Sequence, residues 1–255
     1  MFEIALLAIL QGIAEFLPIS SSGHLVIGEH VLGLHAPGMR LDIGLHVGTL
    51  VSIVVFYWSI VWRIVRQREW GYMGRIILSA VPACLLYFIG KDWFDATAKD
   101  VHVVGVLLMV TGAVLIGTRF LPRGTRPVGV WGALLMGAAQ ACALWPGLSR
   151  SGLTLAAARL GKIDAEKSAE FSFLMSAPLI VGGLLLEIAK SLASSAPEPG
   201  VAAEVPWGLV AFGAAISAVV GYFALKLLLR TLRSASFWLF GFYCLTAGLL
   251  TVILV

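Results

Sequence analysis

The chain has 255 residues, of which 59% are hydrophobic and only 13% are charged, and its formal net charge is +4. Soluble domains carry about 25% charged residues, so this composition excludes a soluble protein and indicates an integral membrane protein. The Lys and Arg residues lie mainly at the ends of apolar segments. Positive charges in such positions set the orientation of a protein in the membrane, and this explains them better than nucleic-acid binding does. We therefore expect membrane lipids, and no nucleic acid, as partners.

The first apolar region, about residues 2–33, is interrupted near its middle by Pro18 and a run of serines. Each half is shorter than the roughly 20 residues that a helix needs to cross a bilayer. We therefore predict a re-entrant helix–turn–helix hairpin, which is tolerated where protein or a water-filled cavity surrounds the broken backbone. A second region of the same kind covers about residues 128–161.

Six continuous apolar segments are long enough to span a membrane, at about 42–64, 72–90, 101–120, 168–190, 207–230 and 236–254. The chain is thus predicted to be an all-α integral membrane protein with six transmembrane helices and two re-entrant hairpins. The order of one hairpin and three spans occurs twice, so we expect a single membrane domain, 1–255, built from repeat 1 (about 1–120) and repeat 2 (about 128–255). An odd number of spans per repeat makes the second copy inverted relative to the first.

Basic residues gather after the first, third and fifth spans, which places them on one side of the membrane if the span count is correct. By the positive-inside rule this side is cytoplasmic. The segment 194–204 lies between spans on the opposite side. The basic residues are Arg63, Arg66, Arg68 and Arg75, then Arg119, Arg123 and Arg126, then Lys226, Arg230 and Arg233.

The first hairpin contains a polar motif from Gln11 to His24. Glu15 lies one helical turn after Gln11, so the two side chains share a face. An ionisable group at membrane depth is costly and usually marks function, although a helix–helix hydrogen bond is the simpler alternative. The run Ser20–Ser22 can cap the next helix, and it can also bind an anion at the helix N-terminus. A hydroxyl beside the imidazole of His24 is the minimum for an activated nucleophile.

The second hairpin contains the segment Pro146–Thr154, in which Arg150 lies between two serines. The planar guanidinium binds phosphate oxygens in a bidentate fashion. The alternative is that Arg150 snorkels toward the membrane surface or pairs with Glu15, and the pairing would itself bring the two motifs together. When aligned on Gly23 and Gly152, both motifs carry Gln twelve positions earlier and Ser one and three positions earlier. Outside these motifs, His46 follows Asp42 by one helical turn, and a packed pair is favoured there over a functional role.

On these residues the chain resembles the undecaprenyl-diphosphate phosphatases of the bacitracin-resistance type. The family motif of Gln or Glu, three residues, Glu, then Phe-Leu-Pro-x-Ser-Ser-x-Gly-His matches Gln11 through His24. The motif Pro-Gly-x-Ser-Arg-Ser-Gly-x-Thr matches Pro146 through Thr154, and the stretches 45–49 and 170–174 fit as well. The resemblance implies an enzyme of the bacterial inner membrane that removes the terminal phosphate from undecaprenyl diphosphate. Its active site would open to the periplasm, and its product is the lipid carrier for peptidoglycan synthesis.

The resemblance also implies the site residues, position by position. The catalytic set is Glu15, Ser21, His24 and Arg150, and the substrate-binding set is Gln11, Ser20, Ser22, Ser149, Ser151 and Thr154. Mg²⁺ or Ca²⁺ is the implied cofactor, with Glu15 as candidate ligand, but Gln11 removes one anionic ligand.

Several alternatives stay open from the sequence. The nucleophile is Ser21, His24 or a metal-activated water. A transporter or flippase for a lipid phosphate would use the same anion site, and a homodimer is compatible with the sequence.

Overall fold

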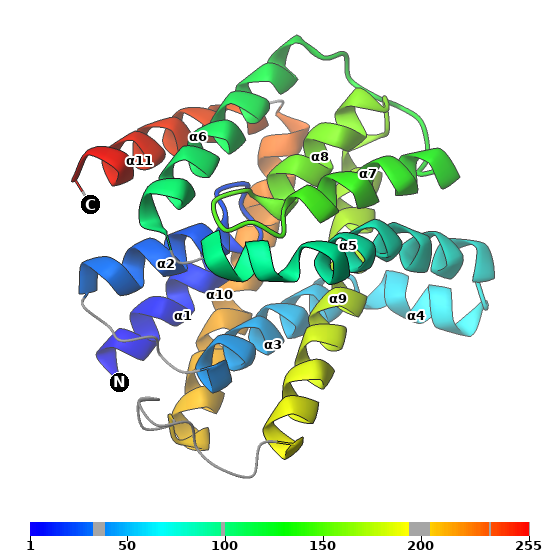
Figure 1. The fold of residues 1–255 in the computed structure, drawn as a ribbon. Helices are drawn as coiled ribbons and strands as arrows, with labels where there is room; N and C mark the ends of the chain where they lie inside the picture. Colours follow the sequence, from blue (N-terminus) through cyan, green and yellow to red (C-terminus); the bar gives the residue numbers. More distant parts are fainter. Residues whose placement is uncertain (33–38, 98–99, 194–204, 235, 255) are drawn as a thin grey trace.

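The structure is a computed structural model, and it describes residues 1–32, 39–97, 100–193, 205–234 and 236–254 (Figure 1). These residues form eleven α-helices and two short 3₁₀ helices, and no strand occurs among them. The predicted all-α class is therefore confirmed. The predicted outside segment, 194–204, lies beyond the described residues.

The two interrupted regions form helix–turn–helix pairs. The first hairpin consists of α1 (Phe2–Ala14) and α2 (Ser21–Leu32), and the second of α7 (Val130–Cys142) and α8 (Arg150–Leu160). These helices are 11 to 13 residues long, so none can span a bilayer alone. The turns that separate the paired helices carry the polar motifs.

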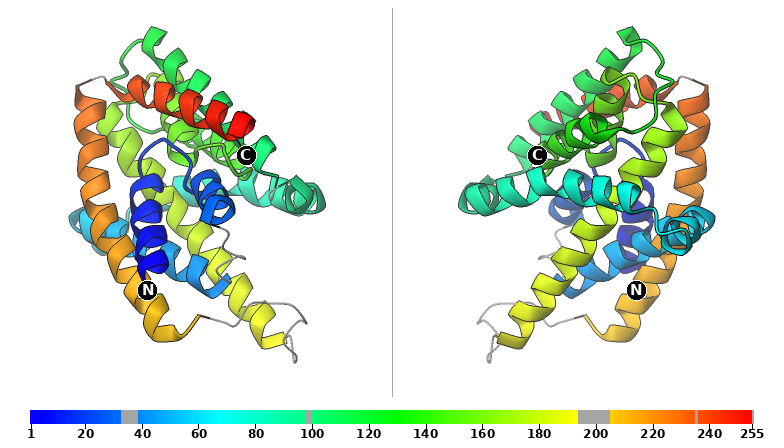
Figure 2. Two further views of the ribbon diagram at one scale, coloured as in Figure 1. Left: turned by 90° about the vertical axis from the view of Figure 1, so that its left-hand side faces the viewer. Right: turned by 90° about the vertical axis from the view of Figure 1, so that its right-hand side faces the viewer.

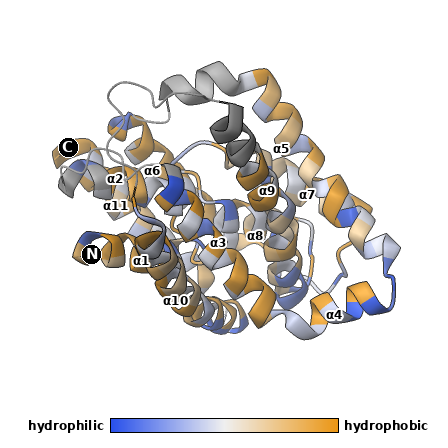
Figure 3. Cartoon of the chain, turned by 90° about the horizontal axis from the view of Figure 1, so that it is seen from below, coloured by the Kyte–Doolittle hydropathy of each residue, from blue (hydrophilic) through white to orange (hydrophobic). Residues whose placement is uncertain are grey.

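Five helical segments are long and apolar enough to cross a membrane. They are α5 (Trp70–Thr97), α6 (Val101–Gly117) with η1 (Thr118–Phe120), α9 (Ala165–Ala193), α10 (Trp207–Arg233), and η2 (Phe237–Leu239) with α11 (Phe240–Leu254). Figure 3 shows hydrophobic residues over most of the helices and hydrophilic residues near the turn between α4 and α5.

The sixth predicted span, 42–64, is not one straight helix. It is divided into α3 (Met39–Phe56) and α4 (Trp58–Arg66), which meet at an angle of 74°. Tyr57 lies between them with φ −99° and ψ 23°, outside the α-helical region. Six spans result only if this bent pair counts as one. The exposed Trp58 and Trp62 rings on α4 are amphipathic side chains typical of a membrane interface.

Helix packing relates the two halves of the chain. The α1 helix packs against α10, α7 packs against α5, and α6 packs against α11 (Figure 2). The helices α6 and α11 approach each other closely because glycines of both helices lie at their contact. A Cβ on Gly105 would lie 3.0 Å from the Gly248 carbonyl oxygen, and one on Gly112 would lie 2.7 Å from that of Gly241. The two helices are therefore antiparallel, with Gly105 facing Gly248 and Gly112 facing Gly241, and the inverted repeat stays a prediction.

Contacts link two of the three basic groups to the start of α9. The Arg233 Nε lies 2.8 Å from Glu166 Oε1, and Tyr72 OH donates to Glu170 Oε1 at 3.1 Å beside Arg75. In the remaining group, the Arg119 guanidinium stacks at 4.5 Å over Trp238, which is close in sequence to Arg233. The basic connections thus gather at one end of the molecule, although their cytoplasmic location stays a prediction.

Candidate active site

The tips of the two hairpins are joined by hydrogen bonds. The Ser20 hydroxyl accepts from the amide of Gly147 at 3.1 Å and from that of Gly23 at 3.3 Å, and it donates to the Leu148 carbonyl at 3.4 Å. Ser20 and Gly147 both have positive φ, 68° and 97°. A Cβ on Gly23 would come within 3.0 Å of the Gly147 backbone, so this position needs glycine for the tips to meet.

The predicted binding residues of the second motif also hold the hairpins together. The Ser151 hydroxyl donates to the Leu17 carbonyl at 3.1 Å, and Ser149 caps α8 by accepting from the Gly152 amide at 3.1 Å. Thr154 is buried and shares a 2.6 Å hydrogen bond with Ser172. These side chains fix the shape of the site. Ser149 and Ser151 also face the cavity described next.

Thr111 of α6 is a residue that sequence reasoning missed. Its hydroxyl donates to the Gly147 carbonyl at 2.9 Å and accepts from the Ser149 amide at 3.1 Å. Thr111 thus anchors the turn between α7 and α8 to the helix α6. A single threonine within an apolar span gives no signal in the sequence that would separate it from a packing residue.

A cavity of about 280 Å³ lies between the hairpin tips and the helices α3 and α9. Its polar lining consists of Glu15, Ser20, Ser21, Ser22, His46, Ser149, Arg150, Ser151 and Ser176. Its apolar lining consists of Ala14, Ala143, Leu144, Leu148, Leu179 and Ile180. Most of the predicted site residues are therefore brought together, although their positions in the sequence fall into two distant motifs.

Glu15 is the centre of the polar network. Its carboxylate forms an ion pair with the Arg150 Nη2, accepts from the Ser21 hydroxyl at 2.7 Å, and accepts from the Gln11 amide at 3.1 Å. Glu15 is only 7% exposed. A buried ion pair must offset a large desolvation cost, so it is weak evidence for a stabilising role and indicates function instead.

Arg150 retains binding capacity beyond this pair. Its buried Nη1 has no hydrogen-bond partner among the described residues. A buried donor without a partner is costly, and it is explained if a ligand supplies the acceptor. The N-termini of α2 and α8 begin at Ser21 and Arg150, so both helix dipoles favour an anion in the cavity.

His24, in contrast, is not among the described residues that line the cavity. Its Nδ1 lies 2.9 Å from the Ser20 carbonyl oxygen and must donate to it, while Nε2 lies 2.7 Å from the hydroxyl of Tyr243. The two rings also stack, with centroids 5.6 Å apart. Both ring nitrogens are therefore engaged, and the catalytic role that we expected for His24 stays a prediction.

The imidazole in the cavity belongs to His46 of α3. Its Nδ1 lies 2.9 Å from the Asp42 carbonyl oxygen and 3.4 Å from the Asp42 carboxylate, so the predicted pair is present. Its Nε2 lies 3.9 Å from the Glu15 carboxylate. From the sequence a packed pair is favoured over a functional role here, because the helical spacing of Asp42 and His46 explains their contact without any reference to the first motif.

The expected divalent cation finds no preformed site in this arrangement. No group of three His, Cys, Asp or Glu side chains with metal-binding geometry occurs within the described ranges. Glu15 is the only carboxylate among the described cavity-lining residues, and Arg150, Ser21 and Gln11 already contact it. Mg²⁺ and Ca²⁺ prefer several oxygen ligands. The cofactor therefore stays a prediction, and no chemical step is derived through it.

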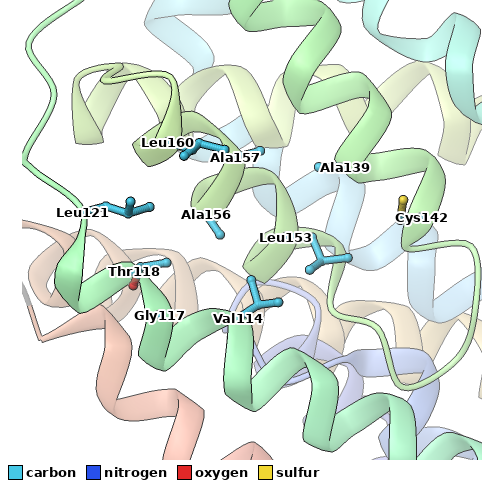
Figure 4. A pocket seen from close by; sticks show the side chains of 10 residues that line it. All are labelled: Val114, Gly117, Thr118, Leu121, Ala139, Cys142, Leu153, Ala156, Ala157 and Leu160. Atoms are coloured by element: carbon cyan, nitrogen blue, oxygen red, sulfur yellow. The ribbon is translucent and has the colours of Figure 1, made fainter.

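A second cavity, of about 330 Å³, lies between α6, α7 and α8 (Figure 4). Its lining includes Val114, Leu153 and Leu160, and Thr118 and Cys142 are its most polar residues. Because none of the described residues that line it is charged, this cavity does not suit a phosphate group. The cavity at the hairpin tips is therefore the candidate anion site.

Comparison with known proteins places this arrangement in context. The sequence model of the family described as bacitracin resistance protein BacA matches residues 4–250, which include both hairpins. An undecaprenyl-diphosphatase of Rhodopirellula baltica is 39% identical over 257 residues, covering 100% of this chain and 98% of the relative. One of Halothermothrix orenii is 34% identical, covering 99% and 97%. Undecaprenyl-diphosphatase 4 of Bacillus thuringiensis is 33% identical, covering 99% and 96%.

Proposed function

The chain belongs to the bacitracin resistance protein BacA family, and from this membership and the geometry of the site we propose that it is an undecaprenyl-diphosphatase. It hydrolyses undecaprenyl diphosphate to undecaprenyl phosphate and inorganic phosphate. This reaction recycles the lipid carrier for peptidoglycan synthesis and gives resistance to bacitracin. The observation that carries the proposal is the meeting of Glu15, Ser21 and Arg150, from two hairpins, in one buried cavity.

The cavity suits both parts of the substrate. Arg150 and the two helix N-termini supply positive potential for the diphosphate. Leu144 and Leu148 lie on the same cavity wall as Arg150, and Leu179 and Ile180 of α9 provide further apolar surface. These side chains suit the isoprene units next to the diphosphate. A lipid with a charged head and an apolar chain therefore matches the lining better than a free phosphate does.

Ser21 is the nucleophile that the geometry favours. Its hydroxyl already donates to Glu15 at 2.7 Å, so Glu15 is in position to accept the proton as Ser21 Oγ attacks the terminal phosphorus. The bond from that phosphorus to the bridging oxygen breaks, and undecaprenyl phosphate leaves with the electron pair. Water then attacks the phosphoserine, which releases inorganic phosphate and restores the serine hydroxyl.

Arg150 stabilises the charge that spreads over the terminal phosphoryl oxygens in the transition state. In the ligand-free protein the Nη1 of Arg150 has no hydrogen-bond partner among the described residues and can donate to the phosphate directly. The Nη2 releases the Glu15 carboxylate when the substrate binds and then donates to the phosphate as well. His24 is a weaker candidate for the nucleophile because Ser20 and Tyr243 engage both of its ring nitrogens.

The enzyme is expected in the bacterial inner membrane, with its cavity open to the periplasm. The five or six apolar spans support a multi-pass membrane protein. The grouping of the basic connections supports one defined orientation, with the exposed Arg66 on the cytoplasmic side. An Arg66→Cys variant that lacks the native cysteines should react with an impermeant thiol reagent only in inside-out vesicles. Reaction in intact cells would reverse the orientation.

The deciding experiment is an assay of inorganic phosphate release by the purified protein in detergent, with undecaprenyl diphosphate as substrate. We expect catalytic release with many turnovers per enzyme. A carrier for a lipid phosphate needs the anion site but no nucleophile and base. Transport of lipid phosphate in reconstituted vesicles without phosphate release would therefore contradict the enzymatic function.

A further inference from the structure

Among the described residues that line the cavity there is one imidazole, and it comes from outside both hairpin motifs. His46 lies on α3 and borders the cavity with its side chain 30% exposed. Its Nε2 lies 3.9 Å from the same Glu15 oxygen, Oε2, that accepts the Ser21 hydrogen bond. His46, Glu15 and Ser21 thus form a continuous row of polar groups.

Asp42 determines the orientation and the tautomer of this imidazole. The Nδ1 of His46 lies 2.9 Å from the carbonyl oxygen of Asp42 and 3.4 Å from its carboxylate; both are acceptors, so Nδ1 carries a proton. When one ring nitrogen is fixed in this way, the other is the one that exchanges its proton. Nε2 lies 3.9 Å from the Glu15 carboxylate, so this distance must shorten before a protonated ring can donate a hydrogen bond to Glu15.

Substrate binding changes the partners of Glu15. In the ligand-free protein the charge of Glu15 is compensated by Arg150. The phosphate competes for the same guanidinium, and a buried carboxylate that loses its partner is strongly destabilised. His46 is the remaining group next to Glu15, among the described residues that line the cavity, that becomes cationic on protonation.

We propose that His46, held by Asp42, is a positioning residue that donates a hydrogen bond to Glu15 when Arg150 turns to the phosphate. Glu15 then stays ionised and directed at the Ser21 hydroxyl, so it can act as the base for the attack. The proposal rests on the function proposed above. It assigns His46 a role in the chemical step and none in holding the diphosphate.

Kinetics of three variants in detergent test this role, with undecaprenyl diphosphate as substrate. Removing a partner that orients a catalytic group typically costs about 10–100-fold in activity. We expect this loss in kcat for His46→Ala, with KM nearly unchanged. His46→Gln restores an amide donor close to the position of Nε2 and should recover most of the loss. Asp42→Asn should give a smaller decrease in kcat, and because the Asp42 side chain is 54% exposed, this change should not impair folding.

His102→Gln is the matched control, since His102 is exposed at the start of α6, outside the site, and its substitution should leave kcat unchanged. A wild-type kcat for His46→Ala would overturn the proposal, and so would a loss that appears only in KM. A His46→Gln variant as slow as His46→Ala would also overturn it, because a hydrogen-bond donor would then not suffice. If His46→Ala fails to fold, the kcat values of His46→Gln and Asp42→Asn decide. Absence of phosphate release by the wild-type protein would instead contradict the proposed function itself.

Discussion

The backbone amide of Gly147 donates a hydrogen bond of 3.1 Å to the side-chain hydroxyl of Ser20, and each of these residues lies at the tip of a different hairpin. Both have positive φ, so each chain turns sharply at the point of contact. This bond fixes the distance between the two polar motifs. Glu15 and Ser21 flank one tip and Arg150 follows the other, so the contact determines whether a base, a nucleophile and a phosphate ligand share one cavity.

Ser20→Ala should destabilise the protein and lower its activity together. The substitution leaves the buried Gly147 amide without its acceptor, which costs about 1–3 kcal/mol in the free energy of unfolding. Thermal unfolding in detergent, alongside phosphate release, measures both effects. Ser234→Ala, at an exposed serine in the α10–α11 connection, is the control and should unfold at the wild-type temperature. Unchanged stability in Ser20→Ala would show that the tips are held by other contacts.

Arg150→Lys should reduce kcat/KM by about 100-fold or more, although the positive charge is kept, because lysine cannot present two parallel donors to phosphate oxygens. Steady-state phosphate release measures the loss. Arg66→Lys changes an exposed arginine on α4 in the same way and should behave like the wild type. Activity of Arg150→Lys close to that of the wild type would rule out a bidentate phosphate contact.

Rapid acid quenching during turnover should trap a phosphoserine at Ser21. Phosphoserine is stable in acid and labile in base, whereas phosphohistidine is labile in acid and stable in base. The stability of the phosphoenzyme in acid and in base therefore shows whether the phosphoryl group is on Ser21 or on His24. Tyr243→Phe frees the Nε2 of His24 by removing a 2.7 Å hydrogen bond. We expect this variant to lose about 0.5–1.5 kcal/mol of stability and to keep the phosphoserine. An acid-labile phosphoenzyme would transfer the nucleophilic role to His24.

Titration calorimetry with Mg²⁺ or Ca²⁺ should detect no specific binding to the ligand-free protein. Glu15 offers the only carboxylate among the described cavity-lining residues, and Arg150 already occupies it. Phosphate release with and without a chelator then shows separately whether the reaction needs a cation that arrives with the diphosphate. One-to-one binding that is lost in Glu15→Gln would contradict this expectation and identify a cation site at Glu15.

The sequence alone predicts the two hairpins and most of the polar residues of the cavity. Pro18, the serine run and the Pro146–Thr154 segment interrupt apolar regions, and a backbone break at membrane depth has few structural solutions. The pairing of Glu15 with Arg150 was one of the alternatives considered, and the structure contains it. The spacing of residues in the sequence could not predict the hydrogen bonds of the Ser20 side chain. They depend on the positive φ of Ser20 and on the amide of Gly147 in the other hairpin.

The features that sequence reasoning missed depend on tertiary packing. The bend at Tyr57 has no proline or glycine to signal it, and the apolar run continues across it. Thr111 and His46 belong to long helices whose local pattern is explained without the site. His24 is adjacent to the serine run in sequence, yet its ring is directed toward Tyr243 of α11. Which residues face a cavity is decided by the rotation of each helix, and short motifs do not encode it.

The most direct test of the account is the initial rate of phosphate release from undecaprenyl diphosphate by the purified wild-type protein and by Ser21→Ala, measured side by side. The account predicts sustained turnover by the wild type and loss of nearly all activity in Ser21→Ala, with both proteins folded. Equal rates for the two proteins, or no release by either, would contradict a phosphatase site formed at the hairpin tips with Ser21 as its nucleophile.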